Sequence, residues 1–337
     1  MPTIAAVATA FHPDERLTAV VEAALKSCSR VVVVDNTPDG APDNGSADAE
    51  ALVKTLSDLP GVTVLRDGRN RGLAGALNAG VAELCKPADR NTNGEAHTGT
   101  NGEAHTGING EAEADTAALP DLPTLPDLIL FLDQDSVLPE DLVQGLAAHF
   151  TTPTVGIAAP APWDEQQGRF YEPGTEAGPD VADRDAVITS GMLVRRTVLD
   201  QVGPFRTDFF VDHVDNDFCL RVRAAGFRIL RDKRHKLAHS LGQRNQHKLP
   251  GVSVASSRHP TWRLYWIARN GTILIREHRK DAPAWSRNTG AYLVWWFLLR
   301  TLIEAPRGPR ALAMLRGFRD GFRGRTSRRY LPPGAEI

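Results

Sequence analysis

The first part of the chain alternates short apolar segments with segments of helical periodicity, and this alternation most constrains the fold. Four of the segments are short, apolar and rich in branched side chains, which predicts buried β-strands. Two others place apolar residues on one helical face. Together they predict an α/β protein with a mixed, mostly parallel sheet flanked by helices. The strands are expected at 4–9, 31–35, 62–65 and 128–132, and the helices at 17–25 and 69–84. Further along the chain we expect a helix at 139–150, with Pro139 at its start, and a loop-rich segment at 153–187.

Two of the expected strands end in carboxylates. The segment LILFLDQDS carries Asp133 and Asp135 directly after its apolar run, and Asp35 follows VVVV. Ligands of open α/β sheets bind beyond the carboxyl ends of the strands. A carboxylate pair there suits a divalent cation shared with phosphate oxygens. A solvated strand end followed by a helix N-cap at Asp135 or Ser136 explains the same residues, so the pair alone leaves both interpretations open.

A second acidic cluster lies in FFVDHVDNDFCLR. Carboxylates held near aromatic rings tend to have a raised pKa, which favours a general base. We interpret Asp215 and Asp217 as candidate catalytic residues, and Asp212 as an acidic residue that stabilises a helix N-terminus. His239, in HKLAHSLG, is a candidate metal ligand, because the expected strand FRIL could return it to the same site.

Several segments, taken in order, resemble the family-2 glycosyltransferases of GT-A fold, and among these the bacterial rhamnosyltransferases. The resemblance covers about residues 3–275 without the repeat described below. His12 and Asp217 depart from the family's usual Asn and Glu, and the Ser that usually follows the Asp35–Asn36 pair is missing. The segments are VATAFHP, VVVVDNTPDG, RNRGLAGALNAG, LDQDS, ITSGMLV, VDNDFCLR and HSLG.

The resemblance implies an inverting transfer of a sugar from a nucleotide-diphosphate sugar to a glycan or lipid-linked glycan. LDQDS favours dTDP-L-rhamnose as the donor, although galactofuranosyl and N-acetylglucosaminyl transferases share most of these features. Asp215 is the preferred base and Asp217 the second choice. The residues expected to bind a divalent metal, Mn²⁺ or Mg²⁺, are Asp133, Asp135 and His239. Those expected at the nucleotide-sugar are Thr9, Asp35, Asn36, Asn70, Gly72, Asn78, Asp133, Ser190 and Gly191.

The composition suggests two regions. Residues 1–257 are expected to form the catalytic domain, interrupted at 91–126 by a disordered low-complexity insertion with the repeat NGEAHTGT. Residues 258–337 are expected to form a helical, basic C-terminal extension. Three widely spaced cysteines and the absence of a basic, apolar leader predict a reduced cytoplasmic protein.

The C-terminal extension is strongly basic. Between Arg258 and Arg329 it has 16 Lys and Arg residues against four acidic ones. The uncharged segment between Arg287 and Arg300 contains two adjacent Trp and is too short to span a bilayer. We expect it to lie on the inner face of the plasma membrane, with Arg on anionic lipid. Packing on the enzyme's own core or on a second subunit is the alternative. Nucleic acid binding is not expected.

Two other functions compete with sugar transfer. A sugar-nucleotidyltransferase would need a Gly-rich loop with a basic residue after the first strand, and FHPDER does not provide one. A non-catalytic scaffold that binds a nucleotide-sugar is the remote alternative.

Overall fold

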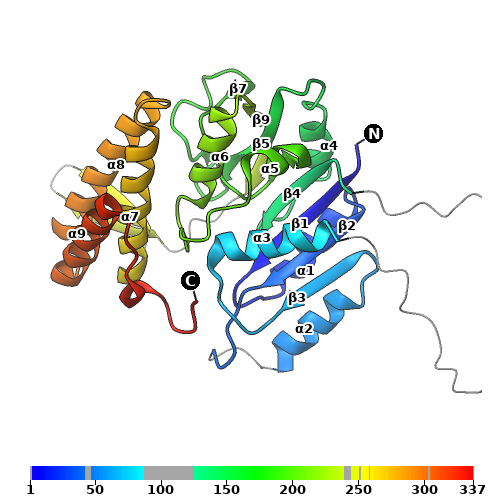
Figure 1. Ribbon diagram of the computed structural model, residues 1–337, viewed down its shortest axis with the longest axis horizontal. Coiled ribbons are helices and arrows are strands. Elements are labelled where there is room, and N and C mark those ends of the chain that lie inside the picture. Colours follow the sequence, from blue (N-terminus) through cyan, green and yellow to red (C-terminus); the bar gives the residue numbers. More distant parts are fainter. Residues whose placement is uncertain are drawn as a thin grey trace, which may run out of the picture.

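The computed structural model describes residues 2–41, 47–86, 125–238, 244–249, 252–257, 259–302 and 304–336. Most of the expected insertion (91–124) and His239 lie outside the described residues. Nine strands of the described residues form one sheet (Figure 1). They are β1 (Ile4–Ala10), β2 (Arg30–Asp35), β3 (Val62–Arg66), β4 (Leu128–Asp133), β5 (Val155–Asp164), β6 (Arg169–Phe170), β7 (Val181–Asp183), β8 (Met192–Arg195) and β9 (Arg228–Ala238).

The strand order explains where a ligand can bind. The sheet runs β3-β2-β1-β4-β8-β5-β9-β7, with β6 beside β5. β1 pairs in parallel with β2 and β4, β2 with β3, and β5 with β9, whereas β8 is antiparallel to both of its neighbours. The predicted mixed, mostly parallel sheet is confirmed. Because β1, β2 and β4 are parallel neighbours, their carboxyl ends meet at one edge.

Helices cover both faces of the sheet. On one face α1 (Arg16–Leu25), α2 (Ala47–Ser57) and α4 (Leu142–Ala147) share a hydrophobic core with the strands of the sheet. On the other face α3 (Gly72–Leu84), α5 (Arg196–Val202) and α6 (Val214–Ala224) do the same. Alternate residues of one strand serve the two cores: Val7 faces α3, whereas Ala6 and Ala8 face α1. Because helices cover both faces of the sheet, a ligand can reach it at the ends of its strands.

Three local predictions differ from the structure. The helix expected at 139–150 is regular over Leu142–Ala147. Helix α2 was not anticipated, because its sequence ADAEALVKTLS has few apolar residues. The loop-rich segment expected at 153–187 contains β5, a central strand of the sheet. Pro160 and Pro162 in β5 argue against a strand on sequence grounds, since proline cannot donate a hydrogen bond to a ladder.

The C-terminal part forms a helical bundle beside the sheet (Figure 1). It contains α7 (Thr261–His278), α8 (Pro283–Leu302), α9 (Arg307–Arg323) and η1 (Arg328–Tyr330), and it follows an antiparallel pair, β10 (Arg244–Leu249) and β11 (Val252–Ser257). Hydrogen bonds tie α7 to the loop before α6: Asn270 Nδ2 donates to the carbonyls of Val211 (2.9 Å) and Asp212 (3.0 Å). The bundle is therefore anchored next to the acidic cluster.

The last described residues return from the bundle to the sheet. Trp266 Nε1 donates to the Tyr330 carbonyl (2.7 Å), and the Tyr330 ring stacks on Tyr265 at 4.4 Å. Beyond this anchor the Glu336 N–H donates to the Asn70 carbonyl (2.9 Å), and the Asn70 N–H donates to Gly334 (3.4 Å). We call residues 331–336 the C-terminal strap.

No helix among the described residues is both long enough and apolar enough to cross a membrane.

Candidate active site

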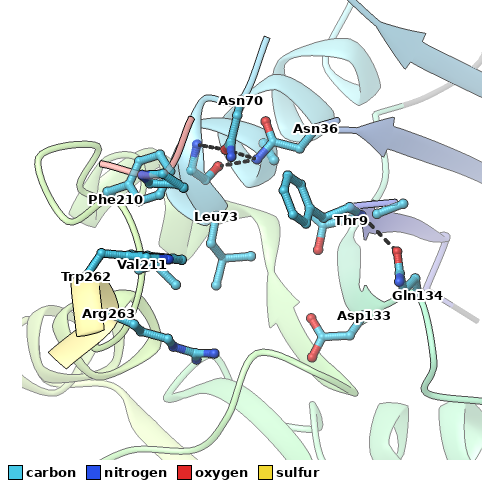
Figure 2. A pocket seen from close by; sticks show the side chains of 15 residues that line it. Thr9, Asn36, Asn70, Leu73, Asp133, Gln134, Phe210, Val211, Trp262 and Arg263 are labelled. Carbon is cyan, nitrogen blue, oxygen red and sulfur yellow. Dashed lines mark hydrogen bonds between the residues drawn. The ribbon is translucent and has the colours of Figure 1, made fainter. Parts of the chain in front are cut away.

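A cavity of about 540 Å³ opens where β1, β2 and β4 end. Figure 2 shows its two walls: the strand ends and the loop before α3 on one side, and the loop before α6 with the start of α7 on the other. Apolar and aromatic side chains predominate among its lining residues, and Asp133 and Arg263 carry opposite charges. The lining residues are Thr9, Ala10, Phe11, Asn36, Asn70, Gly72, Leu73, Ala76, Asp133, Gln134, Phe210, Val211, Trp262, Arg263 and Pro332.

Two buried asparagines form one end of the cavity. Asn36 Nδ2 donates to Asn70 Oδ1 (3.1 Å) and to the Gly72 carbonyl (3.2 Å), and the Gly72 N–H donates to Asn70 Oδ1 (3.0 Å). Gly72 has a φ of +68°, and a Cβ there would collide with the Phe210 carbonyl oxygen. A glycine is therefore required to bring the start of α3 against the opposite wall. The network fixes a polar surface on which a planar ring with amide-like groups could be recognised.

Asp133 lies at the end of β4 and is partly buried. Burial raises the pKa of its carboxyl to about 6, and the neighbouring Asp135 adds to the rise. Asp135 itself lies 3.7 Å from Arg16 and is partly exposed. Within the described residues, no hydrogen bond reaches the Asp133 carboxylate, and no three His, Cys, Asp or Glu side chains form a ready metal site. Asp135 thus has Arg16 as a partner, whereas the Asp133 carboxylate accepts no hydrogen bond from the described residues and is open to a ligand.

Asp215 lies in the first turn of helix α6 and interacts electrostatically with Asp133. Burial raises the pKa of its carboxyl to about 6 against hydrogen bonds from Asn216, and the charges of Asp212 and Asp133 raise the pKa further. The preceding Asp212 and His213 have φ values of +60° and +62°. Two non-glycine residues in this region are strained, and such strain gathers at functional sites. Asp215 does not line the cavity, but its carboxyl has a raised proton affinity and lies close enough to Asp133 for the two charges to interact.

Comparisons with known proteins show which family the chain belongs to. A model of the family described as glycosyltransferase like family 2 matches residues 2–234. The chain belongs to this family. The dTDP-rhamnosyl transferase RfbF of Shigella flexneri is 23% identical over 289 residues, which cover 82% of this chain and 80% of RfbF.

Solved structures share the fold. The S. aureus TarS 1–349 crystal structure matches with a TM-score of 0.56 and 12% identity, covering 95% of this chain and 80% of that one. The structure of TarS 1–349 in complex with UDP-GlcNAc matches with the same score and identity, covering 95% and 81%. The predicted GT-A fold and the predicted glycosyltransferase class are both confirmed.

The glycosyltransferase gathers most of its predicted donor residues at this edge of the sheet. Thr9, Asn36, Asn70, Gly72 and Asp133 line the cavity. Asp35 lies just below it with its carboxylate engaged, accepting the Thr37 N–H (3.0 Å) and lying 3.5 Å from Arg66 Nε.

Ser190 and Gly191 precede β8 and do not line the cavity in the described structure. The Gly191 N–H donates to the Phe131 carbonyl (2.8 Å), and a Cβ at this φ of +78° would lie 2.7 Å from Pro160 Cγ. Ser190 Oγ is buried, and the described residues offer it no hydrogen-bond partner. Their role at the sugar stays a prediction.

Asn78 and Asp217 differ from the expectation. Asn78 Nδ2 donates to the Phe205 carbonyl (2.8 Å) and Asn78 Oδ1 accepts the Phe205 N–H (2.9 Å), so its amide joins α3 to the loop before α6. Asp217 is 1% exposed and pairs with Arg221 (2.8 Å) and Arg206 (3.6 Å). Both side chains are occupied by structural contacts, because they point into the interface between α3, α6 and the core.

Sequence reasoning missed the wall opposite the strand ends. Phe210 and Val211 directly precede the acidic cluster, and their aromatic and apolar character was a usable signal. Trp262, Arg263 and Pro332 come from the basic C-terminal part, which was interpreted as a membrane-surface extension and not as part of the site. The sequence contains no spacing that would bring them back to a strand end.

Proposed function

We propose that this glycosyltransferase binds a nucleotide-diphosphate sugar in the cavity and transfers the sugar, with inversion, to a hydroxyl of a glycan. The observation that carries the proposal is the cavity itself, which brings the Asn36–Asn70 network and Asp133 to one edge of a GT-A sheet. In the transfer the acceptor oxygen attacks the anomeric carbon, and the bond from that carbon to the diphosphate oxygen breaks. The nucleoside diphosphate leaves with the bonding electron pair.

Asp215 is the base in this proposal. A carboxylate whose pKa is about 6 is ionised near neutral pH and still accepts a proton better than an ordinary Asp. It takes the acceptor's hydroxyl proton as the new bond forms. Asp217 is the weaker candidate, because its carboxylate already pairs with Arg221 and Arg206.

Asp133 and Asp135 fit a divalent cation, Mn²⁺ or Mg²⁺. Both are carboxylates, which these hard cations prefer, and Asp133 lacks a hydrogen-bond donor among the described residues. His239 stays a predicted third ligand outside the described residues. A bound cation would neutralise charge on the leaving diphosphate.

Metal removal should therefore abolish transfer. We expect chelation with EDTA to lower the transfer rate by about a hundredfold or more, and Mn²⁺ to restore it. We expect Asp135→Ala to show the same loss and to need more Mn²⁺ for half-maximal activity. Transfer that persists at full rate in EDTA would contradict the metal assignment, and unchanged thermal unfolding of the chelated protein would show that the fold is intact.

The donor we propose is dTDP-L-rhamnose. RfbF, named a dTDP-rhamnosyl transferase, is similar over most of both chains, and LDQDS favours the same sugar. The TarS complex with UDP-GlcNAc supports an N-acetylglucosaminyl transferase as the second candidate, and a galactofuranosyl transferase is a third.

A panel of nucleotide-sugars with Mn²⁺ tests the donor. A ligand that binds the native state raises the unfolding temperature by mass action. We expect dTDP-rhamnose to give the largest rise, and a larger rise with UDP-GlcNAc would overturn the choice of sugar. Release of dTDP on addition of a glycan acceptor tests catalysis, and a scaffold would return the donor unchanged.

We propose a membrane-surface location on the cytoplasmic face of the plasma membrane and a lipid-linked glycan as the acceptor. Helix α8 supports this, because it exposes Trp295 (54%), Val294 (59%) and Leu302 (64%) to solvent. One expectation fails: Arg300 is fully buried and pairs with Glu304, so it cannot contact lipid. A second subunit covering the same face is the alternative.

A further inference from the structure

Arg263 stands opposite Asp133 across the cavity (Figure 2). Among the lining residues that the structure describes, it is the cation. It is the third residue of α7 and lies beyond residues 2–234, which the family model matches. Partial burial of this charge costs hydration free energy, so we expect an interaction in the cavity that compensates for it.

Asp212 holds one edge of the Arg263 guanidinium. Arg263 Nε donates to Asp212 Oδ2 and Nη2 donates to Asp212 Oδ1, each at 2.9 Å. Within the described residues Nη1 has no hydrogen-bond partner, and the side chain is 38% exposed. Since an arginine carries five N–H donors, this pair leaves donors directed into the cavity.

The scaffold behind Arg263 is rigid. Asp212 has a φ of +60°, and Asn270, which is fully buried on the same helix as Arg263, donates to the Val211 and Asp212 carbonyls. The strained loop is therefore fastened to the helix that presents the arginine. Such strain persists where the surroundings impose one geometry. The contacts fix where the guanidinium points, as a preorganised binding group requires.

We propose that Arg263 binds the diphosphate of the donor and stabilises the charge that develops on it as the sugar leaves. This rests on the proposed function. A planar guanidinium with free donors matches phosphate oxygens in a bidentate way. Asp133 and Arg263 line the same cavity from opposite walls, so one ligand can contact both. The bond from the anomeric carbon to the diphosphate oxygen breaks, and Arg263 faces the oxygen that gains charge.

Calorimetric titration with dTDP and dTMP, in Mn²⁺ and without acceptor, tests this. We expect Arg263→Gln to weaken dTDP binding by about tenfold or more and dTMP binding by less than about threefold, because the second phosphate is the proposed partner. Arg263→Lys should lie between, since it keeps the charge and loses the fork. Arg169→Gln, which removes an exposed arginine of β6, is the matched control and should bind dTDP like the parent.

A structural role must be separated from binding. Asp212→Asn keeps the guanidinium and one hydrogen-bond acceptor, so it should lose clearly less dTDP affinity than Arg263→Gln. Equal losses in Asp212→Asn and Arg263→Gln would overturn the inference in favour of a loop-holding role. Unchanged dTDP affinity in a folded Arg263→Gln protein would overturn the inference outright. The proposed function would stay intact in that case, and Arg263 would be free to contact a phosphate of the acceptor instead. A parent protein that binds neither dTDP nor UDP would instead overturn the proposed function.

Discussion

At the scale of single residues, two carboxylates two positions apart have opposite fates. Asp215 faces the region of Asp133 with a pKa raised to about 6, whereas Asp217 is buried and paired with two arginines. Two positions along α6 therefore separate the carboxylate that we propose as the base from one that holds structural contacts. The sequence motif alone does not distinguish them, because both are acidic residues in the first turn of the helix.

For Asp215→Asn we expect transfer to fall by about a thousandfold, since the base is removed. In the parent enzyme, activity should fall as the pH drops below about 6, where the carboxyl becomes protonated.

The same pKa shift predicts how stability depends on pH. Because the folded pKa of Asp215 lies above the ordinary value of 3.8, the carboxyl favours folding at low pH and loses this contribution as the pH rises through 6. Asp215→Asn should therefore be more stable by up to about 3 kcal/mol at pH 8 and nearly equal near pH 4. Urea unfolding at both pH values measures this, and full activity of the variant would refute the assignment.

For Asp217→Asn we expect the converse. Breaking a buried ion pair leaves Arg221 without its carboxylate partner, whereas Arg206 keeps Asp208 and Glu277, so the free energy of unfolding should fall by about 3 kcal/mol. Transfer by the folded variant at low temperature should stay within about threefold, because the carboxylate has no access to the reacting atoms. A stable but inactive variant would make Asp217 the base.

At the scale of elements, α8 has an apolar face that the described structure leaves exposed. Trp295 and Leu302 belong to it, and α9 also exposes Leu315 and Phe322. Trp295→Ser or Leu302→Ser should weaken binding to phosphatidylglycerol vesicles by about tenfold, because each removes a large apolar group from the interface. Cosedimentation measures this, with Leu125→Ser (46% exposed) as the control. Unchanged vesicle binding together with a loss of dimers in sedimentation would favour a subunit interface.

Elements with a strong periodic pattern could be predicted from the sequence, and those without one could not. VVVV and LILFL are apolar on both faces, so β2 and β4 were expected within a residue or two. β5 was hidden by its prolines and α2 by its few apolar residues. The strand-end half of the site followed from the parallel order, whereas Trp262 and Arg263 depend on how the bundle docks, which no local pattern encodes.

At the scale of the whole molecule, the C-terminal strap joins the bundle to the cavity. Both backbone groups of Asn70 bond to it, and Pro332 lines the cavity. Gly334 has a φ of +73°, and a Cβ there would lie 2.6 Å from Pro38 Cβ. Gly334→Ala should displace the strap and raise the KM for the donor by about fivefold or more, with less effect on kcat. Gly324→Ala is the matched control: its φ is +63°, but no atom lies within 4 Å of the added carbon. Equal KM values in the two variants would show that the strap does not shape donor binding.

The division of the cavity between two parts of the chain also limits how such enzymes can be recombined. The Asn36–Asn70 network and Asp133 come from the first 234 residues, whereas Trp262, Arg263 and Pro332 come from the bundle and its strap. A chimaera that exchanged the matched domain alone would pair one enzyme's strand ends and loop before α6 with another's α7 and strap. Donor preference would then belong to neither parent, and a transplant that preserves it has to carry α7 and the strap along with the sheet.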